Sequence, residues 1–89
     1  MIRETILIKN KLGLHARASA KLVTITSSFA SRVHLKRDEK KVDGKSIMSV
    51  MMLAASQGTE LMIEVEGDDE TQALQAIRSL IDDYFGEGE

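Results

Sequence analysis

Cysteine and proline are both missing from this sequence of 89 residues, and only three of its residues are aromatic. Without cysteine, the chain has no disulfide and no thiolate for catalysis. Without proline, its turns must depend on glycine, as at Gly13, Gly44, Gly58 and Gly67. A formal net charge of −2 and so few aromatic rings argue against a basic, base-stacking surface, so we expect no nucleic-acid partner.

Long apolar runs are missing as well. The most apolar run, Ile47–Ala55, has about nine residues and includes Ser49, whereas a membrane-spanning helix needs about 20. The first residues carry charges at Arg3, Glu4 and Lys9 and lack the apolar core of a signal peptide. We therefore expect a cytoplasmic protein that does not insert into a membrane. Its length predicts a single domain, residues 1–89, with no deep cleft, so that function lies on the surface.

Apolar periodicity predicts an α+β domain with the element order βαββαβα. Alternation of apolar residues predicts strands at Ile2–Lys9, Arg32–Arg37 and Glu60–Glu66, and a short strand ending near Val42. Helical spacing predicts helices at Ala16–Phe29 and Asp68–Phe85. The apolar stripe of the first helix includes Ala16, Ala20, Leu22 and Val23. The apolar stripe of the second helix includes Tyr84. We expect the helices to cover one apolar face of a sheet and the tail Gly86–Glu89 to fray.

The segment Ile47–Leu53 fits either a buried strand or a short helix. Its methionines favour a helix, and Ser46 is suited to cap the start of that helix. Ser46 is then either a plain N-cap or a site of regulatory phosphorylation at a helix N-terminus, and these interpretations are compatible. The apolar residues Ile47, Met48, Met51 and Met52 either fill the core or form an exposed docking surface for a partner.

The segment NKLGLHARASAK, Asn10–Lys21, contains one of only two histidines. If a helix begins at Ala16, its first amide groups lack partners and favour an anion. His15 can then act as a nucleophile toward a phosphoryl group, with Arg17 close enough to stabilise the phosphate charge. The alternative is that His15 is an ordinary exposed residue. Two histidines without cysteine make no convincing metal site, and we expect neither a metal ion nor a cofactor.

Two of these motifs resemble the HPr family, the histidine phosphocarriers of the bacterial phosphotransferase system. GLHAR, Gly13–Arg17, resembles the active-site motif of the family, and KSIM, Lys45–Met48, resembles its regulatory serine region. The resemblance extends over essentially the whole chain, because the length and the element order also agree. It implies an open-faced β-sandwich, in which a four-stranded antiparallel sheet carries three helices on one face.

The resemblance also implies roles and partners. According to this resemblance, His15 accepts a phosphoryl group at Nδ1 from phosphorylated enzyme I and donates it to an enzyme IIA protein or domain. The resemblance therefore implies a phosphoryl relay rather than a stand-alone enzyme. Arg17 stabilises the phosphate charge, and Ser46 matches a serine that HPr kinase/phosphorylase modifies in part of the family. Partners dock at Ile47, Met48, Met51 and Met52, and members are generally monomers.

One residue departs from the family pattern, in which proline commonly follows the arginine of the motif. Ala18 stands there in this chain, which predicts a less rigid start of the helix and one more free amide group. Two alternative functions stay open. One is a regulatory binding module of the same fold, in a nitrogen-related branch or under the control of a serine kinase. The other is a small hydrolase with His15 as base, for which no paired nucleophile is evident.

Overall fold

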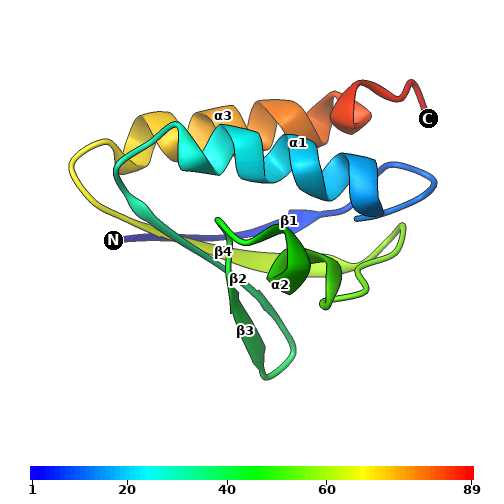
Figure 1. Cartoon of the computed structure of the whole chain (residues 1–89), viewed down its shortest axis with the longest axis horizontal. Helices are drawn as coiled ribbons and strands as arrows, with labels where there is room; N and C mark the ends of the chain where they lie inside the picture. The colour runs from blue at the N-terminus through cyan, green and yellow to red at the C-terminus, as the bar shows by residue number, and fades with distance from the viewer.

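Four antiparallel strands form one sheet in the order β1-β4-β2-β3 in the computed structural model, which describes residues Met1–Glu89 (Figure 1). The predicted α+β class and the order βαββαβα are confirmed, with a short 3-10 turn, η1, added after the last helix. The strands are β1 (Ile2–Leu7), β2 (Arg32–Arg37), β3 (Lys40–Asp43) and β4 (Glu60–Glu66). The helices are α1 (Ala16–Ser27), α2 (Ile47–Met51) and α3 (Glu70–Asp82), and η1 spans Tyr84–Gly86.

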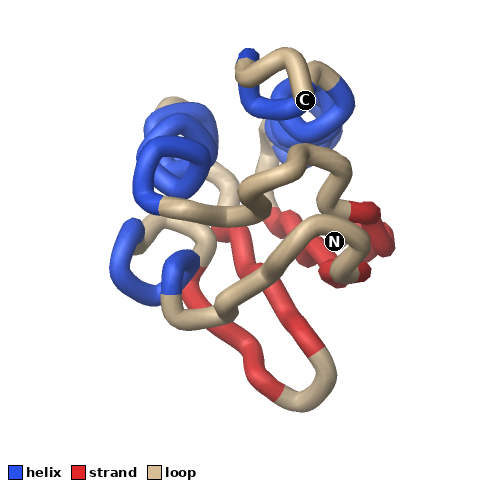
Figure 2. Tube along the Cα trace, turned by 90° about the vertical axis from the view of Figure 1, so that its right-hand side faces the viewer, coloured by secondary structure: helices blue, strands red, loops and turns tan.

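The helices all lie on one side of the sheet, which makes the fold an open-faced sandwich. α1 and α3 run side by side over the sheet, and α2 lies beside α1 above β2 and β3 (Figures 1 and 2). β1 pairs with β4 from Ile2 opposite Val65 to Leu7 opposite Glu60, so the first strand of the chain is completed by the last. None of the helices is both long enough and apolar enough to span a lipid bilayer.

Alternation along the strands sorts apolar side chains onto the face beneath the helices. In β4, Leu61, Ile63 and Val65 are each no more than 1% exposed. Burying one such side chain contributes roughly 1.5–3 kcal/mol to stability, so these positions fix the register of the sheet. The strands predicted at Arg32–Arg37 and Glu60–Glu66 have the bounds that the structure gives them.

The buried stripe of α1 differs from the predicted one. Leu22 and Val23 are buried as expected, but Ala16 is exposed and Ala20 is only half-buried. Ala18, Ser19 and Thr26 take the inner positions instead. Ser19 and Thr26 satisfy their hydroxyl groups internally, since Ser19 Oγ donates to Leu14 O at 3.2 Å and Thr26 Oγ1 donates to Gly44 O at 2.7 Å. Small polar residues therefore pack in the core, and apolar periodicity alone does not predict that they are buried.

The segment after Gly44 is a helix, not a strand, in agreement with its methionine content. Ser46 caps α2, because its Oγ accepts a hydrogen bond from Ser49 N at 3.3 Å. The opposite end is held by two basic side chains of the β2–β3 hairpin. Arg37 Nη1 donates to Leu53 O and Ala54 O at 2.8 Å each, and Lys40 Nζ donates to Met52 O at 2.9 Å. Cations at these carbonyl groups neutralise the negative end of the helix.

The expectation that Gly86–Glu89 frays is wrong. α3 ends at Asp82, and Tyr84 and Phe85 then adopt left-handed backbone conformations with φ of 56° and 53°. This reversal turns Phe85 into the core, where it is fully buried, and leaves Tyr84, the residue predicted to face inward, 38% exposed. The last residues of the chain return to the loop before α1, as Figure 1 shows for the red and blue segments.

Candidate functional site

His15 lies where the loop after β1 meets α1. It is the N-cap residue of α1, with an extended backbone (φ −75°, ψ −179°) and a side chain 29% exposed. The loop is tied to the segment after α2, because Leu14 N donates to Ala55 O at 2.8 Å. Gly13 makes that approach possible, since its φ is +66° and a Cβ there would lie 2.4 Å from Ala55 O. The glycine of the motif thus fixes the backbone immediately before His15.

The start of α1 offers unpaired amide groups next to His15. Ser19 N is the first amide of the helix with an acceptor, His15 O at 2.9 Å, and the amides of Ala16, Arg17 and Ala18 have none in the protein. Arg17 is exposed and forms no ion pair. Free amide groups, the positive end of the helix and an unpaired guanidinium together favour an anion beside the ring.

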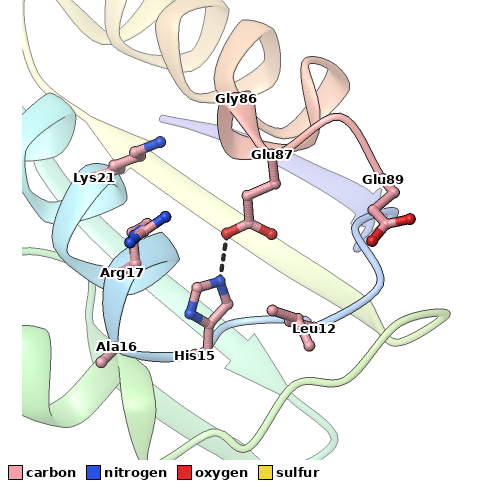
Figure 3. A pocket seen from close by; sticks show the side chains of 8 residues that line it. All are labelled: Leu12, His15, Ala16, Arg17, Lys21, Gly86, Glu87 and Glu89. Carbon is pink, nitrogen blue, oxygen red and sulfur yellow. Dashed lines mark hydrogen bonds and ion pairs between the residues drawn. The ribbon is translucent and has the colours of Figure 1, made fainter.

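The two nitrogens of the His15 ring have different surroundings. Nε2 is hydrogen-bonded to Oε2 of Glu87, which comes from the C-terminal segment. Nδ1 has no protein partner and lies on the side of Ala16 and Arg17, as Figure 3 shows. The nitrogen left free is therefore the one that faces the anion-favouring start of the helix.

Glu87 is held by several groups at once. Its Oε1 accepts a hydrogen bond from Asn10 Nδ2 at 2.9 Å, and its side chain is only 11% exposed. Burial raises the pKa of the Glu87 carboxyl, but the hydrogen bonds from Asn10 and His15 and the charges of His15 and Lys21 outweigh burial, so the net pKa is lowered. Glu87 is thus an ionised acceptor in this setting.

The same segments enclose a surface hollow, whose charged lining consists of Arg17, Lys21, Glu87 and Glu89 (Figure 3). Lys21 Nζ donates to Phe85 O at 2.7 Å and so joins α1 to η1. No group of three or more histidine, cysteine, aspartate or glutamate side chains is arranged to hold a metal ion. The hollow is open, so an anion bound there stays accessible to a second protein.

Ser46 and the apolar residues of α2 lie outside this hollow. Ser46 is half-buried at the start of α2. The side chains predicted to dock partners are all exposed, by 42%, 70%, 38% and 62% for Ile47, Met48, Met51 and Met52 respectively. Of the two interpretations of these residues, core or surface, the structure therefore favours the surface. His15 and Arg17 share the hollow, whereas Ser46 and the four apolar residues do not line it.

Sequence reasoning misses three residues around His15. Asn10 and Lys21 carry no signal of their own, and Glu87 is typical of a solvated tail. Asn10 and Glu87 are 77 positions apart, so no local spacing signals their contact. The one available signal is the pair Tyr84-Phe85 next to glycine, since an aromatic residue near a chain end needs burial and can anchor the residues after it.

Comparison with known proteins identifies the family. A sequence model of the PTS-HPr family, described as the PTS HPr component phosphorylation site, matches residues 2–83. The chain belongs to the HPr family. Among curated HPr proteins, the phosphocarrier protein HPr of Neisseria meningitidis is 51% identical over 89 residues, which is all of both chains.

Solved HPr structures share the fold. HPr-C-His from Thermoanaerobacter tengcongensis superposes on this chain with a TM-score of 0.94 and is 48% identical in sequence. The match covers 98% of each chain. A more distant relative is Crh, described as the Bacillus subtilis catabolite repression HPr, with a TM-score of 0.66 at 39% identity over 90% of this chain and 95% of that one. The predicted fold and family are therefore both confirmed.

Proposed function

We infer that this HPr-family chain is a phosphoryl carrier, in which His15 accepts a phosphoryl group from phosphorylated enzyme I and passes it to an enzyme IIA protein or domain. Membership of the HPr family and the name phosphocarrier protein of its relatives support this function. The observation that carries it is the free Nδ1 of His15 beside the unpaired amides of α1. The carrier acts in the cytoplasm as a monomeric single domain, residues 1–89, and needs no cofactor.

Transfer breaks the bond between phosphorus and the donor and forms a P–N bond to His15. The lone pair of His15 Nδ1 attacks the phosphorus atom of the phosphorylated donor, a new N–P bond forms, and the donor atom leaves with the electron pair of the broken bond. In this step the amides of Ala16 and Arg17, which have no acceptor in the protein, and the Arg17 guanidinium donate to the phosphoryl oxygens. Transfer to enzyme IIA is the same step with His15 as the leaving group.

An open site suits a relay. His15 is 29% exposed at the edge of a hollow, so donor and acceptor proteins can each approach in line and supply the rest of the transfer site. The exposed residues Ile47, Met48, Met51 and Met52 give these partners an adaptable apolar docking surface. The specificity of the relay then depends on which partners fit that surface.

Phosphoenolpyruvate and enzyme I test the function directly. Incubation with both is expected to give one acid-labile, base-stable phosphoryl adduct on the wild-type protein, and His15→Ala is expected to abolish it. His34→Ala is the matched control, because His34 is the other histidine and lies half-buried in β2. Full labelling of His15→Ala, or no labelling of the wild type beside an active HPr, contradicts the function.

Regulation through Ser46 is a second candidate function, supported by the likeness to Crh, the catabolite repression HPr. Ser46 caps α2 next to Ile47 and Met48, which are exposed. A phosphate there adds about two negative charges beside an apolar docking surface and weakens enzyme I binding through desolvation and repulsion. If this candidate is correct, the chain is a regulatory binding module in a nitrogen-related or kinase-controlled branch rather than a sugar-uptake carrier.

The test for Ser46 is labelling by HPr kinase/phosphorylase with ATP. We expect label on the wild type and on Ser49→Ala, and none on Ser46→Ala, because Ser49 lies in the same helix but does not cap it. Ser46→Asp is expected to bind enzyme I more weakly in titration calorimetry. A wild type left unlabelled beside a positive control removes this candidate.

A further inference from the structure

The mechanism uses Nδ1 of His15, but an isolated neutral imidazole can carry its proton on either nitrogen. We propose that a hydrogen-bond relay from Gly13 O through Asn10 and Glu87 holds the proton on Nε2 and thereby makes Nδ1 the nucleophile. Glu87 is then a positioning residue for phosphoryl transfer. This inference rests on the proposed phosphocarrier function.

The relay begins at a backbone carbonyl, which can only accept. Asn10 is fully buried, and its Nδ2 donates both to Gly13 O at 2.8 Å and to Glu87 Oε1 at 2.9 Å. A flipped amide would turn its oxygen toward two acceptors and lose both bonds. Gly13 therefore fixes the orientation of the Asn10 amide, and Asn10 presents a donor to residue 87.

Glu87 in turn acts as a hydrogen-bond acceptor toward the His15 ring. An ionised carboxylate has no proton to donate, and the hydrogen bond that Glu87 accepts from Asn10 favours this ionised form. The contact between its Oε2 and His15 Nε2 must then use a proton on Nε2. The single proton of a neutral ring is thus placed on Nε2, and Nδ1 keeps the lone pair that attacks phosphorus.

The backbone around Glu87 is anchored on both sides. Phe85 is fully buried, and its carbonyl accepts a hydrogen bond from Lys21 Nζ at 2.7 Å. Two residues after Glu87, Glu89 O accepts a hydrogen bond from Lys11 N at 3.0 Å. These contacts join the C-terminal segment to α1 and to the loop before it. Glu87 is therefore held by structure that does not depend on its own side chain.

The relay also balances charge during transfer. When Nδ1 forms its bond to phosphorus, Nε2 keeps its proton, so the ring becomes cationic beside the Glu87 carboxylate. When the phosphoryl group leaves, the electron pair returns to Nδ1 and the ring is neutral again. No proton is gained or lost at His15 in either step, so neither partner needs a group that moves one.

The decisive test compares Glu87→Gln with Glu87→Ala. In Glu87→Gln, the Asn10 donor attracts the amide oxygen, so the amide NH2 faces His15 Nε2 and donates to it. The proton is then forced onto Nδ1, and the rate of phosphoryl transfer from enzyme I is expected to fall at least about tenfold. Glu87→Ala only releases the ring and is expected to lose about two- to fivefold. A purely structural role predicts the opposite order, with the isosteric glutamine milder than alanine.

Nitrogen NMR of the unphosphorylated proteins reads the tautomer without any partner protein. At about pH 9, where an ordinary imidazole is neutral, we expect the proton of His15 on Nε2 in the wild type, on Nδ1 in Glu87→Gln and on both in Glu87→Ala. His34 is the internal reference, because it lies in β2 away from the relay. Asp83→Asn is the matched control, because it also removes one negative charge near the same chain end. The Asp83 side chain is exposed and makes no hydrogen bonds.

Two results overturn the inference: identical His15 tautomers in the wild type and Glu87→Gln, or transfer by Glu87→Gln at least as fast as by Glu87→Ala. Thermal unfolding of the variants shows that they are folded. A wild type that enzyme I does not phosphorylate contradicts the carrier function instead, and the NMR result still tests the relay.

Discussion

At the scale of single residues, Ala18 occupies the position where the HPr family commonly has proline. It is the third residue of α1, is fully buried, and has an amide without an acceptor in the protein. A proline there would remove no hydrogen bond, and its ring would restrict the unfolded chain. The missing proline therefore affects the stability of the loop and the start of α1 more than the chemistry of His15.

Ala18→Pro is accordingly expected to raise the free energy of unfolding by about 0.4–1 kcal/mol. The measurement is urea unfolding followed by circular dichroism. Ala20→Pro is the control, because Ala20 lies inside α1, where proline breaks a helical hydrogen bond and costs about 3 kcal/mol or more. If both variants are destabilised alike, the buried site has no room for the ring and the explanation is wrong.

At the scale of helices and strands, elements with strong periodicity are predictable. β2 and β4 alternate apolar and polar residues, and their bounds can be read from the sequence. The nature of α2 depends on weaker signals, namely methionine content and the cap at Ser46. The C-terminal segment is mispredicted because its position depends on left-handed conformations at Tyr84 and Phe85, which side chains rarely adopt and which the burial of Phe85 helps to stabilise.

The candidate site divides in the same way. His15 and Arg17 belong to one short motif, so the sequence identifies them together. Asn10, Lys21 and Glu87 join the site through contacts between distant segments, and each is an ordinary polar residue in its local context. Local patterns predict His15, the proposed phosphoryl acceptor, whereas its contact with Glu87 depends on how the C-terminal segment returns to the loop before α1.

At the scale of the whole molecule, an ion network across the sheet contributes to stability at acid pH. Glu64 of β4 is buried and pairs with Lys41 of β3 at 2.7 Å and Arg3 of β1 at 2.8 Å. The hydrogen bonds from Lys41 and then Arg3 outweigh burial and lower the pKa of Glu64 from 4.5 to about 2. Because the folded-state pKa is the lower one, this stabilisation is complete above pH 4.5 and is lost as the pH falls toward 2.

Glu64→Gln is therefore expected to flatten the pH dependence of stability between pH 4.5 and 2, measured by urea unfolding across that interval. A residual slope persists, because hydrogen bonds also lower the pKa of Asp69, mainly from Ser31, and that of Asp82, mainly from Lys9. Glu66→Gln is the control, since Glu66 is exposed on the same strand and forms no ion pair. An unchanged slope in Glu64→Gln would contradict this assignment.

The pairing of β1 with β4 has a consequence for synthesis on the ribosome. β1 is translated first, but its partner β4 begins only at Glu60. At a translation rate of 5–20 residues per second, β1 therefore stays unpaired for roughly 3–12 s. With no proline in the chain, folding includes no slow isomerisation of a prolyl peptide bond. The His15 ring gains its Glu87 contact later still, after residue 87 has been made. A nascent chain thus carries His15 for seconds before Glu87 exists to hold its ring.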